Sequence, residues 1–184
     1  MNFISKSTIC LIVIICAMIN IAWTPWGSIY ESARDERSVA DQAADKQISL
    51  SIKAKLADRD KGKALKVHVY CFLRHVYLVG AIDDTAFRSF AVGTATVTKD
   101  VKKVTKYFVR ESDTTASDLE IATRVRAKLI AEEELSSTQI ENEVMNGEVV
   151  MLGMVRTKAD ARLAIKLTKS VEGVRKVTSF LITP

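Results

Sequence analysis

The sequence contains few of the side chains from which catalytic and metal sites are most often built. It has three cysteines and two histidines in 184 residues. Cys10 and Cys16 lie in an apolar N-terminal segment, so Cys71 is the one cysteine in the rest of the chain and cannot form an internal disulfide framework. We expect Cys71 to be a buried, unreactive residue on a strand.

The sequence motifs of cofactor and substrate chemistry are also absent. No glycine-rich phosphate loop, nucleophile elbow or zinc-ligand spacing occurs in it. His68 and His75 have neither cysteine nor clustered carboxylate partners and make a poor metal site. The paired acids Asp83 and Asp84 are explained by the start of a helix. We therefore expect no catalysis, metal, cofactor or small-molecule substrate.

Residues 1–23 are predicted to be an export signal or a membrane anchor. Lys6 is followed by an almost wholly apolar stretch at 8–23, and the next charge is Glu31. This stretch is short for a membrane span, which needs about 20 residues. Cys16 is a candidate lipidation site although Ile15 precedes it, and cleavage near Ala22 is an alternative. A retained anchor, a lipidated Cys16 and ordinary cleavage all remain open, and residues 24–44 are interpreted as a linker.

The remaining chain consists of one small module that occurs twice in tandem. The sequence VKKVT at 101–105 returns as VRKVT at 174–178, an offset of 73 residues. The same offset places Ile48 on Ile121 and Gly80 on Gly153, and no gap is needed. Such a fixed register indicates a tandem repeat. We place the first module at 45–112 and the second at 117–184.

Each module is predicted to have the element order α-β-β-α-β. In the first, apolar residues recur every four positions at Ile48, Ile52 and Leu56, which is typical of an amphipathic helix. A polar loop at 58–63, strands at 65–72 and 75–82, a helix from Asp84 to about residue 99 and a strand at 102–110 follow. The turn at 73–74 has neither Gly nor Asn, the residues that tight turns of this kind favour.

The second module repeats this order with clearer turn signals. Ser117 or Asp118 is expected to cap a helix at 117–131, and Asn146-Gly147 joins strands at 139–145 and 148–155. Thr157 is expected to cap the next helix, and the last strand covers 175–182. The fold class is therefore α+β, with two tandem modules that each pack two helices on a small three-stranded sheet.

These residues resemble a known family. The apolar strand that ends in glycine (76–80 and 149–153) and the Val-x-Lys-Val-x-x-Phe/Tyr ending (101–107 and 174–180) are similar to the BON domain, which is found in pairs in bacterial envelope proteins. The segment at 35–39 resembles that of the division- and outer-membrane-stress-associated lipid-binding lipoproteins. The osmotically induced periplasmic proteins are similar in the modules. The resemblance implies a non-catalytic protein of the Gram-negative envelope, in the periplasm and anchored through its N-terminus.

The same resemblance implies a membrane site on the first helix of the second module. That helix would bind anionic phospholipid and support envelope integrity. The family's helix uses an aromatic side chain at the interface, and residues 117–131 contain none. We expect Ile121, Val125 and Leu129 to be core residues. The candidate lipid-binding residues are Leu119, Arg124, Arg126, Lys128 and Ile130.

The net charge of +5 fits an anionic partner but does not identify it. A basic run at Lys99, Lys102, Lys103 and Lys106 lies beside Tyr107, a mixture that nucleic-acid-binding proteins use. An exported protein rarely meets nucleic acid, so we expect none. Two hypotheses stand: a protein that binds anionic phospholipid at the membrane surface, and a chaperone-like or scaffold protein that recognises envelope proteins.

Overall fold

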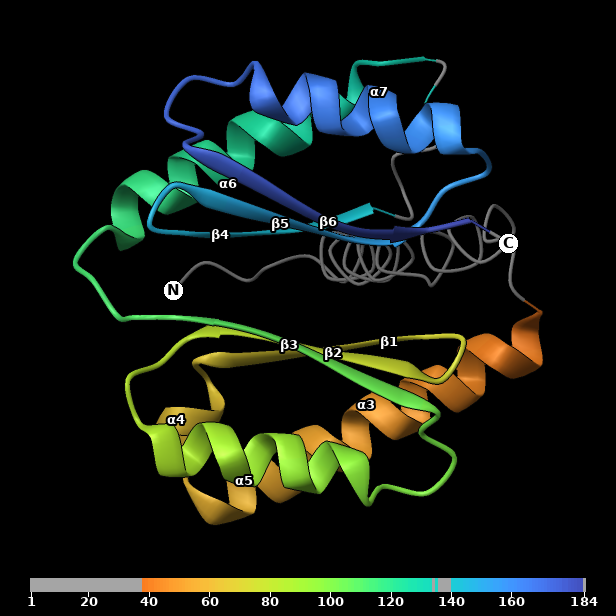
Figure 1. Cartoon of the computed structure of the whole chain (residues 1–184), viewed down its shortest axis with the longest axis vertical. Helices are drawn as coiled ribbons and strands as arrows, with labels where there is room; N and C mark the ends of the chain where they lie inside the picture. The colour runs from red at the N-terminus through yellow and green to blue at the C-terminus, as the bar shows by residue number, and fades with distance from the viewer. Residues whose placement is uncertain (1–37, 134, 136–139, 184) are drawn as a thin grey trace, which may run out of the picture. The chain divides into compact units, whose positions relative to one another are not determined.

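The computed structural model describes residues 38–133, 135 and 140–183. Residues 35–184 form one compact unit. The first module consists of α3 (Val39–Arg59), α4 (Lys61–Ala64), β1 (Val67–Phe72), β2 (His75–Ala81), α5 (Thr85–Thr96) and β3 (Lys103–Val109). The second consists of α6 (Thr115–Ile130), β4 (Ile140–Met145), β5 (Glu148–Met154), α7 (Lys158–Lys169) and β6 (Lys176–Ile182) (Figure 1).

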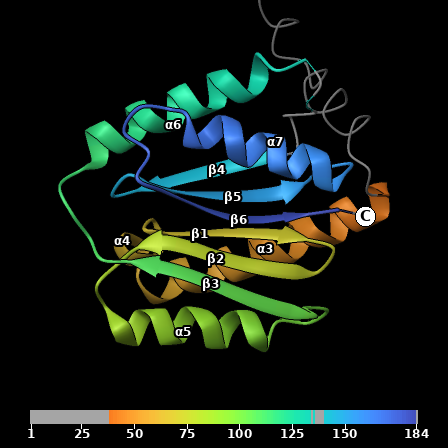
Figure 2. The same cartoon turned by 45° about the horizontal axis from the view of Figure 1, so that its top comes forward.

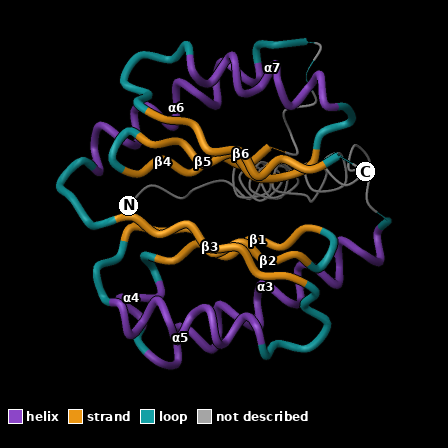
Figure 3. Tube along the Cα trace, viewed as in Figure 1, coloured by secondary structure: helices purple, strands orange, loops and turns teal. Residues whose placement is uncertain are grey.

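Each module has its own three-stranded sheet, with the order β1-β2-β3 in the first and β4-β5-β6 in the second. The first two strands of each sheet are antiparallel and joined by a tight turn, whereas the third runs parallel to the second. A parallel neighbour requires a crossover, which α5 and α7 provide. The helices of each module lie on one face of its sheet (Figure 3). The predicted α+β class and the tandem modules are confirmed.

The core of each module is formed by the predicted apolar stripe of its first helix. Ile48, Ile52 and Leu56 pack in one cluster with the helix-facing residues of β1 and β2. Their counterparts in α6 are Ile121, Val125 and Leu129, which are at most 7% exposed. A repeat at helical spacing therefore buries the same face in both modules.

The first helix begins earlier, and the segment after it is more regular, than the sequence suggested. Ser38 caps α3 by accepting the N–H of Asp41, so residues 39–44, which we interpreted as linker, are helical. The predicted polar loop at 58–63 contains the end of α3 and the short helix α4, whose N-cap Asp60 accepts the N–H of Lys63. In both cases a polar side chain satisfies an N–H that has no partner inside the helix.

The other predicted caps divide into two that are confirmed and one that is wrong. Asp84 caps α5, and Thr157 forms a capping box with Asp160 at the start of α7. Helix α6, however, starts at Thr115 and has no side-chain cap. Asp118 lies inside the helix and is only 8% exposed. Its carboxylate has a different role.

A buried aspartate in the first helix of each module holds the turn of the hairpin. Asp118 accepts the N–H groups of Asn146 and Gly147, both at 2.8 Å. Asp45, at the same place in the repeat, accepts the N–H groups of Leu73 and Arg74, also at 2.8 Å. Both turn residues have positive φ in both hairpins, 51° and 65° in the first and 57° and 70° in the second. Asn-Gly adopts this conformation readily, whereas Leu-Arg depends on the external acceptor.

A glycine is the second-last residue of the central strand in each sheet, and the local reason differs between the two modules. A Cβ on Gly80 would lie 2.0 Å from the carbonyl oxygen of Lys66, where β1 begins. Gly153 at the equivalent position has a φ of 123°, which side chains disfavour. The backbone geometry at this position therefore favours glycine in both modules, through a close contact at Gly80 and a positive φ at Gly153.

Candidate functional site

Helix α6 exposes the two apolar residues that the sequence suggested for membrane contact. Leu119 is 68% exposed and Ile130 is 60% exposed, whereas the core stripe of the same helix is buried. The two residues are separated by about three helical turns, so they lie on one face of the helix. Among the residues with described placement, none of the helices combines the length and the hydrophobicity needed to span a bilayer.

The three predicted basic residues of α6 have different environments. Arg124 pairs with Glu120 at 2.6 Å and with Glu172 at 3.7 Å, so it is neutralised on the surface. The guanidinium of Arg126 donates to the carbonyl of Ile140 at 2.6 Å, where β4 begins. Lys128 is exposed and forms no ion pair within the described part of the chain.

These residues divide into two groups around the helix. The spacing of α6 places Arg126 on the same face as Leu119 and Ile130, and places Arg124 and Lys128 on the opposite flank of the core stripe. Arg126 and Ile130 border a shallow depression of about 470 Å³ that Asn142 of β4 closes on one side. The apolar face therefore carries one fixed guanidinium, while the more accessible lysine lies away from it.

The sheets of the two modules pack on each other through the faces that the helices leave uncovered. Figures 1 and 2 both show four layers in the order helices, sheet, sheet, helices. One apolar cluster combines side chains of both sheets, namely Tyr77, Val79, Met145, Val150 and Leu152. Both faces of β2 and β5 are consequently buried. This contact fixes the two modules as one body.

Polar groups at the border of this contact also pair across it. Tyr70 of β1 donates to the carboxylate of Glu143 of β4, and the two positions are 73 residues apart. They are the same position in the two copies of the repeat. Tyr107 of β3 donates to Glu148 of β5, which also pairs with Lys176 at 3.1 Å. The contact thus approximates a two-fold arrangement of two similar modules.

His68 belongs to this border and pairs with a carboxylate of the other module. Its Nδ1 lies 3.0 Å from the Glu143 carboxylate. This hydrogen bond raises the pKa of His68. Burial alone would raise the pKa of Glu143, but the hydrogen bonds from His68 and Tyr70 outweigh it and leave that pKa below its ordinary value. His75 contacts Thr105 and Tyr77 instead, and the described residues contain no cluster suited to a metal ion.

The repeated module corresponds to a known domain. The sequence profile of the BON domain matches residues 44–110 and 117–183. The chain belongs to the BON-domain family. Osmotically-inducible protein Y of Escherichia coli (strain K12) is 29% identical over 145 residues, which cover 76% of this chain and 72% of that protein.

Two solved structures are also similar to the chain. Both are of CdsD, a structural protein of the type III secretion system of Chlamydia trachomatis, and both are 10% identical to it. The C-terminal domain matches with a TM-score of 0.32 over 76% of this chain and 67% of that one. The second structure matches with a TM-score of 0.33 over 73% and 90%. Similarities of this size do not establish a common arrangement.

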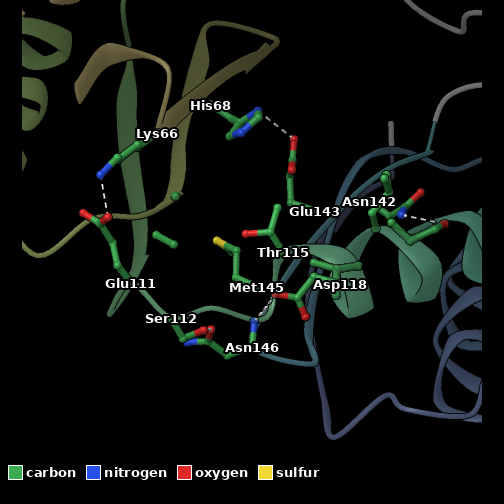
Figure 4. A pocket seen from close by; sticks show the side chains of 15 residues that line it. Lys66, His68, Glu111, Ser112, Thr115, Asp118, Asn142, Glu143, Met145 and Asn146 are labelled. Carbon is green, nitrogen blue, oxygen red and sulfur yellow. Dashed lines mark hydrogen bonds and ion pairs between the residues drawn. The ribbon is translucent and has the colours of Figure 1, made fainter. Parts of the chain in front are cut away.

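A cavity of about 460 Å³ lies where the two BON modules meet. Figure 4 shows its polar side chains paired with one another: Lys66 with Glu111, His68 with Glu143, and Asp118 with the backbone of Asn146. Leu119 and Met145 contribute apolar surface to its wall. The cavity therefore belongs mainly to the contact between modules, and its rim reaches the exposed face of α6.

Some residues that position the site could not be assigned from the sequence. Tyr70 and Glu143 were not singled out because their interaction depends on how the two sheets face each other. A signal was present in β2 and β5, whose nearly continuous apolar runs are typical of strands buried on both faces. Cys16 and the rest of the N-terminal segment lie outside the described residues. Cys71 is buried, as expected, and its thiol lies 3.3 Å from Asp45.

Proposed function

We propose that this BON-domain protein is a non-catalytic component of the bacterial envelope that binds anionic phospholipid through α6. The observation that carries the proposal is the exposed apolar pair Leu119 and Ile130, with Arg126 on the same face of the helix. The family resemblance and the osmotically inducible relative support a place in the periplasm. The predicted N-terminal signal or anchor would bring the modules to the membrane, through a lipidated Cys16 if that residue is modified.

The expected affinity of α6 alone is low. Burying the exposed parts of Leu119 and Ile130 would contribute about 1–2 kcal/mol each. A basic residue near an anionic surface adds roughly 1 kcal/mol. Arg126 lies on the apolar face and can supply this contribution. Arg124 would have to exchange Glu120 for a lipid phosphate, and Lys128 lies on the opposite flank of the core stripe, so both gain less. An N-terminal anchor would raise the effective concentration of the helix at the surface and so strengthen a weak contact.

Cosedimentation of residues 35–184 with lipid vesicles tests this proposal. Vesicles of phosphatidylcholine alone are compared with vesicles that also contain phosphatidylglycerol, at low and at moderate salt. We expect binding only to the anionic vesicles, and weaker binding at moderate salt because the ions screen the charges. Leu119→Ser together with Ile130→Ser should weaken binding at least about thirtyfold, since about 2–4 kcal/mol of apolar burial is lost.

A matched pair of charge reversals distinguishes a specific site from general attraction. Arg126→Glu changes the face of α6 that carries Leu119 and Ile130, whereas Lys53→Glu makes the same charge reversal at the equivalent position of α3. The first should reduce binding more than the second. Equal effects would mean that net charge alone drives the attraction, and the assignment to α6 would then be rejected.

A further inference from the structure

A groove runs along the outer side of the first module, between helix α5 and the edge strand β3. Its volume is about 720 Å³, and its walls include Arg88, Val92 and Gly93 of α5 and Lys106 and Phe108 of β3. Figure 1 shows α5 running alongside β3 on the helical face of the sheet. Strand β3 pairs with β2 on one side only, so its other backbone edge has no partner strand among the described residues.

Gly93 opens this groove, and packing within the protein does not require a glycine there. A Cβ built on Gly93 would meet no atom within 4 Å. Glycine weakens a helix relative to any residue except proline, so its presence in α5 has a cost. The equivalent residue of α7 in the second module is Lys166, which that helix accommodates. The missing side chain leaves room for something outside the chain to approach the helix backbone closely.

The floor of the groove is apolar, whereas its edge is basic. Arg88 is held at one end, where it donates to the carbonyls of Ile82 and Val109 and lies over the ring of Phe108 at 5.8 Å. Val104 and Phe108 pack against the core on the helical face of β3. Lys106 lies between them on the same face and is exposed. The groove therefore has an apolar floor beside a basic edge.

The basic edge continues along the chain before β3. Lys99, Lys102, Lys103 and Lys106 are all exposed, and none of them forms an ion pair within the described part of the chain. Lysine on an edge strand is also a common protection against aggregation. That explanation covers the lysines but not Gly93 or the groove beside them. The combination of an open strand edge, a groove and unpaired positive charge fits a negatively charged extended chain.

We propose that this groove docks an extended acidic peptide segment of another protein. The segment pairs with the free edge of β3 as an additional strand. Alternate side chains enter the space over Gly93, and its carboxylates lie near the lysines. This mode of recognition takes its affinity from backbone hydrogen bonds and its specificity from the pockets for alternate side chains. The second module has no equivalent site, because Lys166 and Ser179 replace Gly93 and Lys106.

The test measures peptide binding by fluorescence anisotropy to the full chain in a neutral detergent. The probes are labelled ten-residue peptides with glutamate at alternate positions and varied apolar or β-branched residues between them. A matched set carries lysine in place of glutamate. We expect members of the acidic set to bind at least about tenfold more tightly than their lysine counterparts, because like charges at an interface are strongly unfavourable.

Two variants and one control locate the binding. Gly93→Leu fills the groove and should weaken acidic peptides about tenfold or more, while leaving the melting temperature equal or higher because leucine favours helices. Lys106→Glu should weaken the same peptides but improve the lysine set. Lys166→Leu, at the equivalent position of α7, should leave binding unchanged. Peptides methylated at every backbone nitrogen should fail to bind, since neither edge can then donate hydrogen bonds to β3.

Three outcomes would overturn the proposal. The first is that every acidic peptide has the same affinity for the wild-type chain as for the Gly93→Leu variant, or a lower one. The second is equal binding of methylated and unmodified peptides, which would exclude an added strand. The third is that Gly93→Leu and Lys106→Glu reduce binding to vesicles containing phosphatidylglycerol but not to peptides, which would assign the groove to a lipid surface.

Discussion

Replacing Asp45 by alanine removes the acceptor that holds the first hairpin turn. The carboxylate receives the N–H groups of Leu73 and Arg74 and is itself only 2% exposed. Hydrogen bonds to a charged group are worth about 1.5–3 kcal/mol each. Water can reach part of the freed turn, so we take the lower value for each bond. The free energy of unfolding is then expected to fall by about 3 kcal/mol.

The second hairpin provides an internal comparison. Asp118→Ala removes the same pair of bonds, but Asn146-Gly147 favours positive φ without help. We therefore expect a smaller loss, about 2 kcal/mol. Introducing Asn-Gly at 73–74 into Asp45→Ala should recover about 1–2 kcal/mol, because a left-handed conformation costs other residues roughly this much.

Urea unfolding of residues 35–184, followed by far-ultraviolet circular dichroism, measures these differences. Asp58→Ala is the matched control, since Asp58 is an exposed acid on the same helix and its loss should change stability by less than about 0.5 kcal/mol. The reasoning is refuted if Asp45→Ala costs no more than this control. It is also refuted if the Asn-Gly turn gives no recovery.

Two further predictions concern the contact between modules and the first hairpin. The hydrogen bond to Glu143 raises the pKa of His68 above 6.5, so its stabilising contribution is complete below that pH and is lost as the pH rises through the raised value. Thermal unfolding between pH 6 and 9 should show this loss in the wild type but not in His68→Gln, and an NMR titration of His68 below 6.5 would contradict the assignment. Gly80→Ala places a Cβ against the Lys66 carbonyl and should lower the free energy of unfolding by more than about 2 kcal/mol. Gly62→Ala, whose nearest neighbour would be 3.5 Å away, should be nearly neutral in the same urea titration.

Local rules were sufficient to predict the main elements of each module, but not the short helix α4 or the first turns of α3. The helical spacing of Ile48, Ile52 and Leu56, the Asn-Gly turn and the caps Asp84 and Thr157 all act between residues close in sequence. The first hairpin was predicted from the composition of its two strands, at 65–72 and 75–82. This was sufficient to place the turn at 73–74, although its residues are unfavourable for it.

Interactions between distant segments could not be predicted in the same way. An aspartate near the start of a helix usually caps it. Nothing in the sequence therefore indicates that Asp118 accepts a hydrogen bond from a turn 28 residues away. The candidate residues of α6 were chosen as one set, but the structure separates Arg124 and Lys128 from the face that carries Leu119 and Ile130. Which basic residue is neutralised also depends on Glu172, which lies in another loop.

The hydrogen bond between Tyr70 and Glu143 is possible because the two modules are parts of one chain, whereas a symmetric dimer of identical modules could not form it. Two identical chains meeting about a two-fold axis would place tyrosine against tyrosine, or glutamate against glutamate, at this point. In a single chain the two copies have diverged, so that one supplies a donor and the other an acceptor. Each module is thereby matched to its own neighbour. Two second modules from different molecules would bring their Glu143 carboxylates together, and this repulsion disfavours pairing of like modules between molecules.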